Sequence, residues 1–235
     1  MTPRSRGWTL IELLVTLSLI TLLMGLLLPA LGQSRSTALR LECLSQLRQM
    51  GIAAEVYLHT YDSFYPPAYW TAGGVLYTWE ITTLPGPQHV PGVLWQGQGT
   101  IAIQQCPSYD GPDNWTDAPY TGYNYNTSYL GRDASPPSPA RQQEVRQPSQ
   151  CAVFGDGGYS GGANKFMRSP LPSPSDAFFS ARYAGAQAFR HQDATNAVFA
   201  DGHGRTLRER FTAGNPNVAP GTGFLSEDNE LYDLE

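Results

Sequence analysis

The stretch RGWTLIELLV (residues 6–15) decides the fold, because it opens an apolar run that continues to Leu31. A helix over residues 8–31 would measure about 36 Å, more than the roughly 30 Å of a bilayer's hydrocarbon core. We therefore predict a single transmembrane helix over 8–31. Arg4 and Arg6 precede it, so the positive-inside bias places the N-terminus in the cytoplasm.

Glu12 is an acidic residue inside this apolar run. A carboxylate in a membrane-spanning segment costs about 2.5–3.5 kcal/mol on the insertion scale, which a plain anchor has no reason to bear. Either Glu12 reaches the interface, or it pairs with a positive group, such as a new α-amino group at residue 8 of a neighbouring subunit. A secretory signal peptide cut near Ala30 is the weaker interpretation, because its apolar region would be shorter and free of acids.

The same ten residues resemble the prepilin signature of type IV pilins and type II secretion pseudopilins. The resemblance implies that a membrane peptidase cuts between Gly7 and Trp8, methylates the new amino group of Trp8, and leaves Glu12 to guide assembly. Trp8 stands where the family usually has Phe, and we expect cleavage to survive this change because both are large aromatic residues. The implied partners are the prepilin peptidase and N-methyltransferase, other pilin-like subunits and an inner-membrane assembly platform.

Residues 32–62 continue the helix with an amphipathic pattern. Pro29 interrupts the backbone hydrogen bonding, either as a simple kink or as a point where the helix loosens during packing. Pro66 and Pro67 end the helix soon after residue 61. The apolar positions recur at steps of three and four, which predicts one buried face. They are Leu39, Cys43, Leu47, Met50, Ala54, Tyr57 and Tyr61.

The rest of the chain predicts an α+β fold, in which this long helix packs on a small antiparallel β-sheet domain over residues 63–225. Many Gly, Pro and Tyr residues fit short strands joined by loops. Two alternating runs around Gly202-His203-Gly204 predict a β-hairpin, and 134–150 reads as an exposed loop. We expect a leader at 1–7 and a frayed acidic tail at 226–235. The runs 75–81, 92–95 and 100–104 read as short strands or irregular loops, and the predicted strands are 151–154, 195–201 and 205–209.

Charge and cysteine content exclude several classes of protein. The net charge is −5, and loss of Arg4 and Arg6 with the leader makes it −7, so nucleic acid is a poor partner. The three cysteines form no CxxC motif for zinc or redox chemistry. One disulfide is plausible outside the cytoplasm. The spacing does not decide the pairing, and Cys43 with Cys106 is the pair that we consider.

His191, nine further residues and Asp201-Gly202 resemble the His-x9-Asp-Gly motif of a large bacterial group of pilin-like proteins. Asp156, His191, Asp201 and His203 are candidate metal ligands. The structural alternative is that the aspartate caps a turn and His191 is hydrogen-bonded within the sheet. Some pseudopilins hold calcium in a C-terminal loop, and this chain offers three acids there as further oxygen ligands. They are Glu227, Asp228 and Glu230.

The sequence contains no nucleophile, P-loop or metalloprotease motif, so we do not expect an enzyme. We also expect no cofactor other than the calcium ion considered above. The resulting hypothesis is a pilin-like structural subunit of the bacterial inner membrane, with a periplasmic C-terminal domain, that assembles into a pseudopilus or type IV pilus-like filament. The alternative is a membrane-anchored extracytoplasmic binding domain, which binds a cation or, as the less favoured form, is an enzyme, and which uses the prepilin leader for export. Replacement of Glu12 separates the two hypotheses.

Overall fold

The structure, a computed structural model, describes residues 8–86, 88–96, 105–109, 111, 122–132, 134, 136–160 and 162–235. It divides into two compact units, residues 1–38 and 39–235, which are described one at a time. The strand expected at 100–104 lies outside the described residues.

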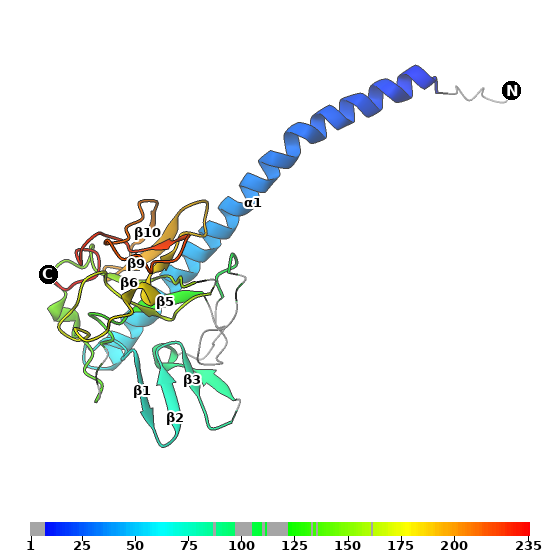
Figure 1. Ribbon diagram of the computed structural model, residues 1–235. Coiled ribbons are helices and arrows are strands. Elements are labelled where there is room, and N and C mark those ends of the chain that lie inside the picture. Colours follow the sequence, from blue (N-terminus) through cyan, green and yellow to red (C-terminus); the bar gives the residue numbers. More distant parts are fainter. Residues whose placement is uncertain are drawn as a thin grey trace. The chain divides into compact units, whose positions relative to one another are not determined.

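Helix α1 (Leu10–Thr60) runs through both units and is the longest element of the chain (Figure 1). It begins with a capping box: the Thr9 hydroxyl accepts from the Glu12 backbone N–H at 3.2 Å, and the Glu12 carboxylate accepts from the Thr9 N–H at 2.8 Å. Pro29 lies within the helix, which continues past it. The helix is long and apolar enough to cross a membrane, as the sequence predicts.

The helix ends where two consecutive residues adopt left-handed backbone conformations. Asp62 has φ 49° and Ser63 has φ 63°. Continuing the α-helix would require the right-handed region at both positions. The end therefore falls ahead of the two prolines, close to the predicted boundary at residue 61.

In the second unit, the predicted apolar face of α1 is largely buried. Cys43, Leu47, Met50, Ala54 and Tyr57 are buried, whereas Leu39 is half-buried and Tyr61 is exposed. This face meets a sheet closely: a Cβ placed on Gly51 of the helix would lie 3.2 Å from Val198 Cγ2 in that sheet. The small residue at 51 thus lets the helix backbone approach the strand.

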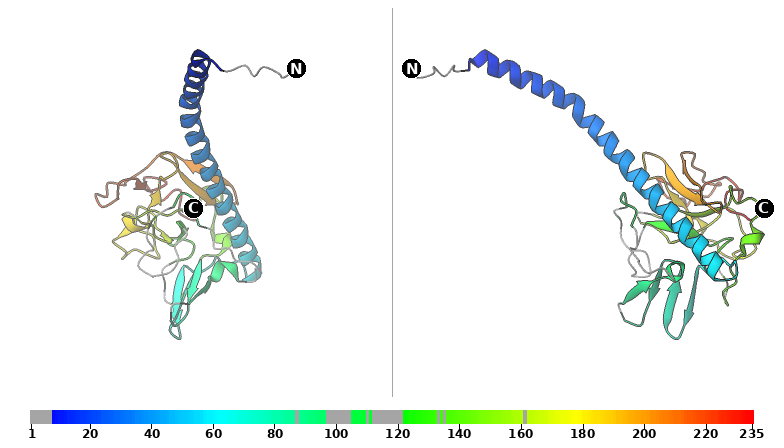
Figure 2. Two further views of the ribbon diagram at one scale, coloured as in Figure 1. Left: turned by 90° about the vertical axis from the view of Figure 1, so that its right-hand side faces the viewer. Right: turned by 180° about the vertical axis from the view of Figure 1, so that it is seen from behind.

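The sheet beside α1 has five strands in the order β10-β9-β6-β5-β7 (Figures 1 and 2). All its neighbours pair antiparallel except β5 and β7, which are parallel. The predicted hairpin at 195–209 is confirmed as the β9–β10 pair. The strands are β5 (Tyr123–Asn126), β6 (Ala152–Asp156), β7 (Phe166–Met167), β9 (Thr195–Phe199) and β10 (Gly204–Leu207).

A second sheet has four antiparallel strands in sequence order, and β8 pairs separately with β11. Aromatic rings connect the two larger sheets: Trp79, just after β2, lies 5.2 Å from Phe154 and 5.8 Å from Tyr125, measured between ring centroids. The remaining strands are β1 (Tyr69–Ala72), β2 (Val75–Thr78), β3 (Ile81–Thr83), β4 (His89–Pro91), β8 (Gln187–Ala188) and β11 (Thr222–Gly223).

Residues 92–95, read from the sequence as a short strand or an irregular loop, instead contain the 3₁₀-helix η1 (Val93–Trp95). The Gly92 N–H donates to the Glu80 carbonyl at 2.8 Å, and a Cβ on Gly92 would lie 2.3 Å from that backbone. The close approach leaves no room for a side chain at residue 92, and the helical turn begins directly after it. A short apolar run does not reveal such a turn, because its periodicity fits a buried helical turn as well as a strand.

The prediction that the acidic tail over 226–235 is frayed is wrong. Tyr232 is fully buried, its hydroxyl accepts from the Leu225 N–H at 2.7 Å, and its carbonyl accepts from Asn126 Nδ2 at 2.8 Å. The Leu231 carbonyl accepts from the Ala152 N–H at the start of β6. These contacts attach the tail to the sheet. Burial of the Tyr232 side chain thus orders the tail although most of the residues around it are acidic. The segment 134–150, predicted as an exposed loop, is not exposed throughout, because two of its described residues, Ala140 and Val145, are buried.

Two buried charge clusters hold loops of the second unit together. Asp176 accepts from Arg168 Nη1 at 3.2 Å and is ion-paired with Arg182, and all three side chains are almost completely buried. Lys165 Nζ lies 2.7 Å from Glu80 Oε1 in a second buried pair. A buried charge without a partner is costly. The loops that carry the members of each cluster are therefore held where the opposite charges can meet.

Candidate functional site

The first candidate site is the start of α1. The large apolar side chains of residues 8–31 are exposed within their unit. The hydroxyls of Thr16, Ser18 and Thr21 each donate to a carbonyl three residues back in the same helix. They therefore need no partner outside the helix. Glu12, the ionisable residue of the run, is held locally by Thr9 through the capping box.

The second candidate site is a buried cluster of Cys43, Cys106, Asp156 and His191. Their ligand-type atoms all lie within 4.8 Å of one another. Cys43 comes from α1, Cys106 from the described segment 105–109, Asp156 from the end of β6, and His191 from the turn before β9. Each is at most 2% exposed. The fold thus brings four distant parts of the sequence to one closed point.

The contacts in this cluster are short. Cys43 Sγ donates to Asp156 Oδ1 at 2.9 Å, and Cys106 Sγ lies 3.6 Å from His191 Nε2. His191 Nε2 also lies 3.3 Å from Asp156 Oδ2. The Arg190 guanidinium, Nη1, approaches Asp156 Oδ1 to 3.9 Å. Asp156 is therefore at the centre of the cluster.

The two thiols differ in acidity. The hydrogen bond from Cys43 lowers the pKa of the Cys106 thiol to about 5, against the opposing effect of burial. Burial and the hydrogen bond to Cys106 raise the pKa of Cys43 far above its usual value. Burial disfavours the charged form of His191, but the contacts with Asp156 and Cys106 outweigh it and raise its pKa to about 9. The neighbouring side chains thus favour the charged forms of Cys106 and His191 and the neutral form of Cys43.

This arrangement is not that of a nucleophilic Cys–His–Asp triad. In a triad, the carboxylate holds one ring nitrogen of the histidine while the other nitrogen faces the nucleophile. Here both Asp156 and Cys106 approach Nε2 of His191. Among the described residues, Nδ1 of His191 has no hydrogen-bond partner. The cluster is also buried, which is unsuited to a substrate.

The structure divides the metal ligands suggested by the sequence into two places. Asp156 and His191 meet in the buried cluster, whereas Asp201 and His203 form a separate exposed pair, with Oδ1 and Nδ1 2.6 Å apart. Asp201 also accepts from the His203 N–H, as expected for an aspartate that caps a turn. The two ends of the His-x9-Asp-Gly motif thus have different roles on either side of β9.

The structure also places the other side chains that the sequence singles out. Within the part of the chain described here, the C-terminal acids considered as calcium ligands do not gather with Asp156, and the group that forms contains two cysteines instead. Cys43 and Cys106 are neighbours, and both are free thiols. The sequence does not reveal that Cys43 and Cys106 lie beside Asp156, because no CxxC spacing or shared strand joins them.

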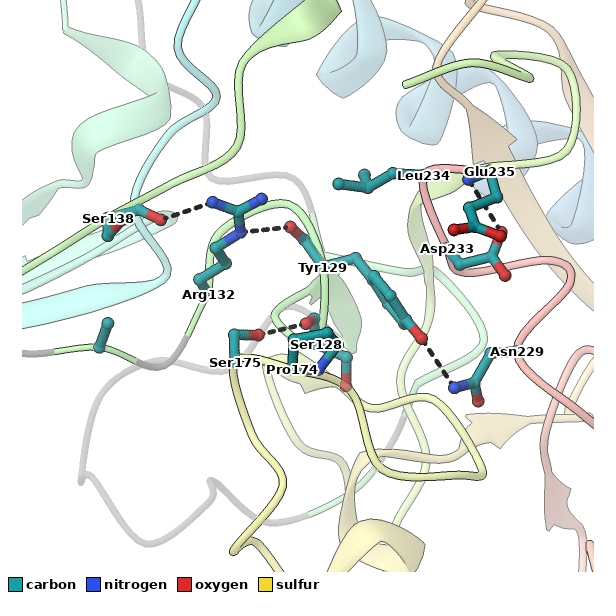
Figure 3. A pocket seen from close by; sticks show the side chains of 11 residues that line it. Ser128, Tyr129, Arg132, Ser138, Pro174, Ser175, Asn229, Asp233, Leu234 and Glu235 are labelled. Carbon is teal, nitrogen blue, oxygen red and sulfur yellow. Dashed lines mark hydrogen bonds between the residues drawn. The ribbon is translucent and has the colours of Figure 1, made fainter. Parts of the chain in front are cut away.

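A surface cavity of about 730 Å³ lies near the C-terminus (Figure 3). Figure 3 shows the Tyr129 hydroxyl accepting from Asn229 Nδ2, at 2.7 Å, and Arg132 donating to the Tyr129 and Ser138 carbonyls. The polar groups of its wall are thus largely bonded to one another. This favours a structural cavity over a prepared ligand site.

Comparison with known proteins identifies the N-terminus. Residues 2–28 match the family model of the prokaryotic N-terminal methylation motif. The match supports a prepilin-type, pilin-like protein, and implies processing by a prepilin peptidase and assembly with other pilin subunits. A single apolar helix at the N-terminus fits a membrane-anchored, single-pass protein. No curated protein and no solved structure matches the chain.

Proposed function

We propose that this protein is a structural, non-enzymatic subunit of a pseudopilus or type IV pilus-like filament of a type II secretion-like system. The observation that carries the proposal is the methylation motif over 2–28 at the head of one exposed apolar helix. The peptidase cuts between Gly7 and Trp8, and Trp8 is then methylated. The His-x9-Asp-Gly resemblance supports the same pilin-like group.

The exposed apolar surface of α1 sets the conditions for assembly. In lipid, apolar side chains give little drive for helices to associate, because lipid tails solvate them equally well. Polar groups and close packing supply the specificity instead. Thr16, Ser18 and Thr21 are bonded within their own helix. Glu12 is then the charged side chain of the described segment 8–31 that can select a neighbour.

The Thr9–Glu12 capping box suggests how a single subunit tolerates this carboxylate before assembly. The carboxylate accepts from both the backbone N–H and the hydroxyl of Thr9, each at 2.8 Å. These bonds satisfy one of its oxygens locally. On assembly, the methylated amino group of Trp8 on a neighbouring subunit supplies a positive charge. The Glu12 carboxylate then gives up its hydrogen bonds with Thr9 and forms an ion pair with that amino group.

A filament assay with Glu12→Val tests the proposal. The full chain is co-expressed with a prepilin peptidase and an assembly platform, and sheared filaments are compared with the membrane pool. We expect the variant to be inserted and cut but to lose filaments. Thr16→Val is the matched control: it also replaces one polar residue of the helix, but its hydroxyl serves only the Leu13 carbonyl, so filaments should remain.

Normal filament assembly by Glu12→Val would reject the proposed role of the carboxylate. Absence of filaments for the wild-type chain, together with normal cleavage, would favour the alternative of a membrane-anchored extracytoplasmic domain. That alternative would place the function in the second unit and leave the leader as an export signal.

A further inference from the structure

The buried cluster of Cys43, Cys106, Asp156 and His191 unites ligand types that are costly to bury together without a common partner. We propose that these four side chains bind one structural zinc ion, with two thiolates, one imidazole and one carboxylate as ligands. This inference is independent of the filament proposal, because it concerns the second unit alone.

The distances between ligand atoms fit a tetrahedral site. Zinc bonds of about 2.3 Å to sulfur, 2.0 Å to nitrogen and 2.1 Å to oxygen put tetrahedral neighbours about 3.3–3.8 Å apart. The observed separations are 3.6 Å for Cys106 Sγ to His191 Nε2 and 3.3 Å for His191 Nε2 to Asp156 Oδ2. Cys43 Sγ lies within 4.8 Å of every other ligand atom and 2.9 Å from Asp156 Oδ1, so zinc binding would replace the Cys43–Asp156 hydrogen bond and move the two atoms apart.

The chemistry of the donors favours zinc over other common ions. Calcium and magnesium prefer six or more oxygen ligands, which this site does not offer. Thiolate and imidazole suit zinc, and four protein ligands with no open position are typical of its structural sites. Three anionic ligands around a dication leave one negative charge, and the Arg190 guanidinium at 3.9 Å from Asp156 balances it.

The surrounding backbone holds the ligands in place. The Asn196 N–H donates to Asp156 Oδ2 at 2.7 Å, which orients the carboxylate toward the cluster. His191 begins a tight turn closed by its N–H donating to the Ala194 carbonyl at 3.0 Å. The next two residues, Gln192 and Asp193, both have φ 55°. Two consecutive left-handed residues are the geometry of a tight two-residue turn, which fixes the course of the backbone directly after His191.

The proposed ion would join α1 to the domain that packs on it. Cys43 lies on the helix, and the other three ligands lie on the sheet side of the contact. Bound zinc would therefore stabilise the attachment of the helix more than any single apolar contact, since structural zinc contributes directly to folding free energy. The buried, closed site gives the ion no open position for catalysis.

Metal content and thiol count test the inference on the wild-type full chain in detergent. The protein is purified without chelators, loaded with zinc and desalted, and its metal is measured by mass spectrometry. We expect about one zinc ion per chain and three titratable thiols after unfolding in chelator. A chelator should lower the melting midpoint of the folded protein. Cobalt substitution should give a thiolate-to-cobalt charge-transfer band.

Two variants separate this site from nonspecific binding. His191→Ala should reduce zinc to background, whereas Cys151→Ser should retain about one ion per chain. Cys151 is equally buried, but its Sγ contacts the Tyr232 carbonyl and lies outside the cluster. One titratable thiol in the wild type would show that two of the three cysteines are joined in a disulfide, so at least one proposed thiolate ligand is lost, and would overturn the proposal. Three thiols with no zinc retained and no effect of chelator would also overturn it.

Discussion

Asp176 offers the sharpest test of how buried charge holds the second unit together. Its side chain is fully buried and accepts from Ser128, Ser173, Arg168 and Arg182. Asp176→Asn keeps the size of the side chain but removes the negative charge that the two arginines face. Leaving buried charges uncompensated costs about 3–5 kcal/mol, so we expect a loss of unfolding free energy of that size.

Urea unfolding of the full chain in detergent, followed by tryptophan fluorescence, measures this loss. Glu144→Gln is the matched control, because it neutralises a carboxylate that pairs with Arg132 on the surface, where the side chains are 24% and 40% exposed. Surface pairs contribute about 0–1 kcal/mol. If Asp176→Asn costs no more than Glu144→Gln, the reasoning about buried charge is refuted.

The pH dependence of the same pair of proteins checks the electrostatic cause. Burial alone would raise the pKa of Asp176, but hydrogen bonds from Arg182, Ser128 and Ser173 outweigh it and lower the pKa below its usual value. The stability from this group is therefore complete above the unfolded pKa of about 3.9 and is lost as the pH falls through the folded pKa. The difference between wild type and Asp176→Asn should shrink below about pH 4.

Three further substitutions test separate parts of the fold. Gly51→Leu should destabilise the second unit by about 1–3 kcal/mol, because its side chain meets Val198 across the helix–sheet contact, and the melting midpoint should show it. Lys165→Met leaves Glu80 without its buried ammonium and should cost about 3–5 kcal/mol in urea unfolding; a loss below about 1 kcal/mol would contradict the ion pair. Asp201→Ala should change stability by less than about 1 kcal/mol, since its pair with His203 is exposed.

The sequence predicts the helix and the hairpin well because each has a local signal. The apolar run, the three- and four-residue steps and the following prolines locate α1 almost completely, and alternation around Gly202 locates β9 and β10. These patterns arise from one stretch of chain. No contact with a distant residue is needed to read them.

What the sequence does not predict depends on contacts between distant segments. Residues 92–95 resemble a short strand or a loop until the close approach of Gly92 to the Glu80 backbone is seen. Tyr232 looks like part of an acidic tail until its carbonyl is found bonded to Asn126. The buried cluster is the clearest case, because Cys43 and His191 meet only through the packing of α1 on the sheet.

Maturation at the N-terminus is the step on which the proposed function depends. It can be measured by mass spectrometry of the full chain, purified after co-expression with a prepilin peptidase. We expect loss of residues 1–7 and a new N-terminus at Trp8 carrying one methyl group. A chain that keeps Gly7 under conditions where a known prepilin is fully cut would contradict it.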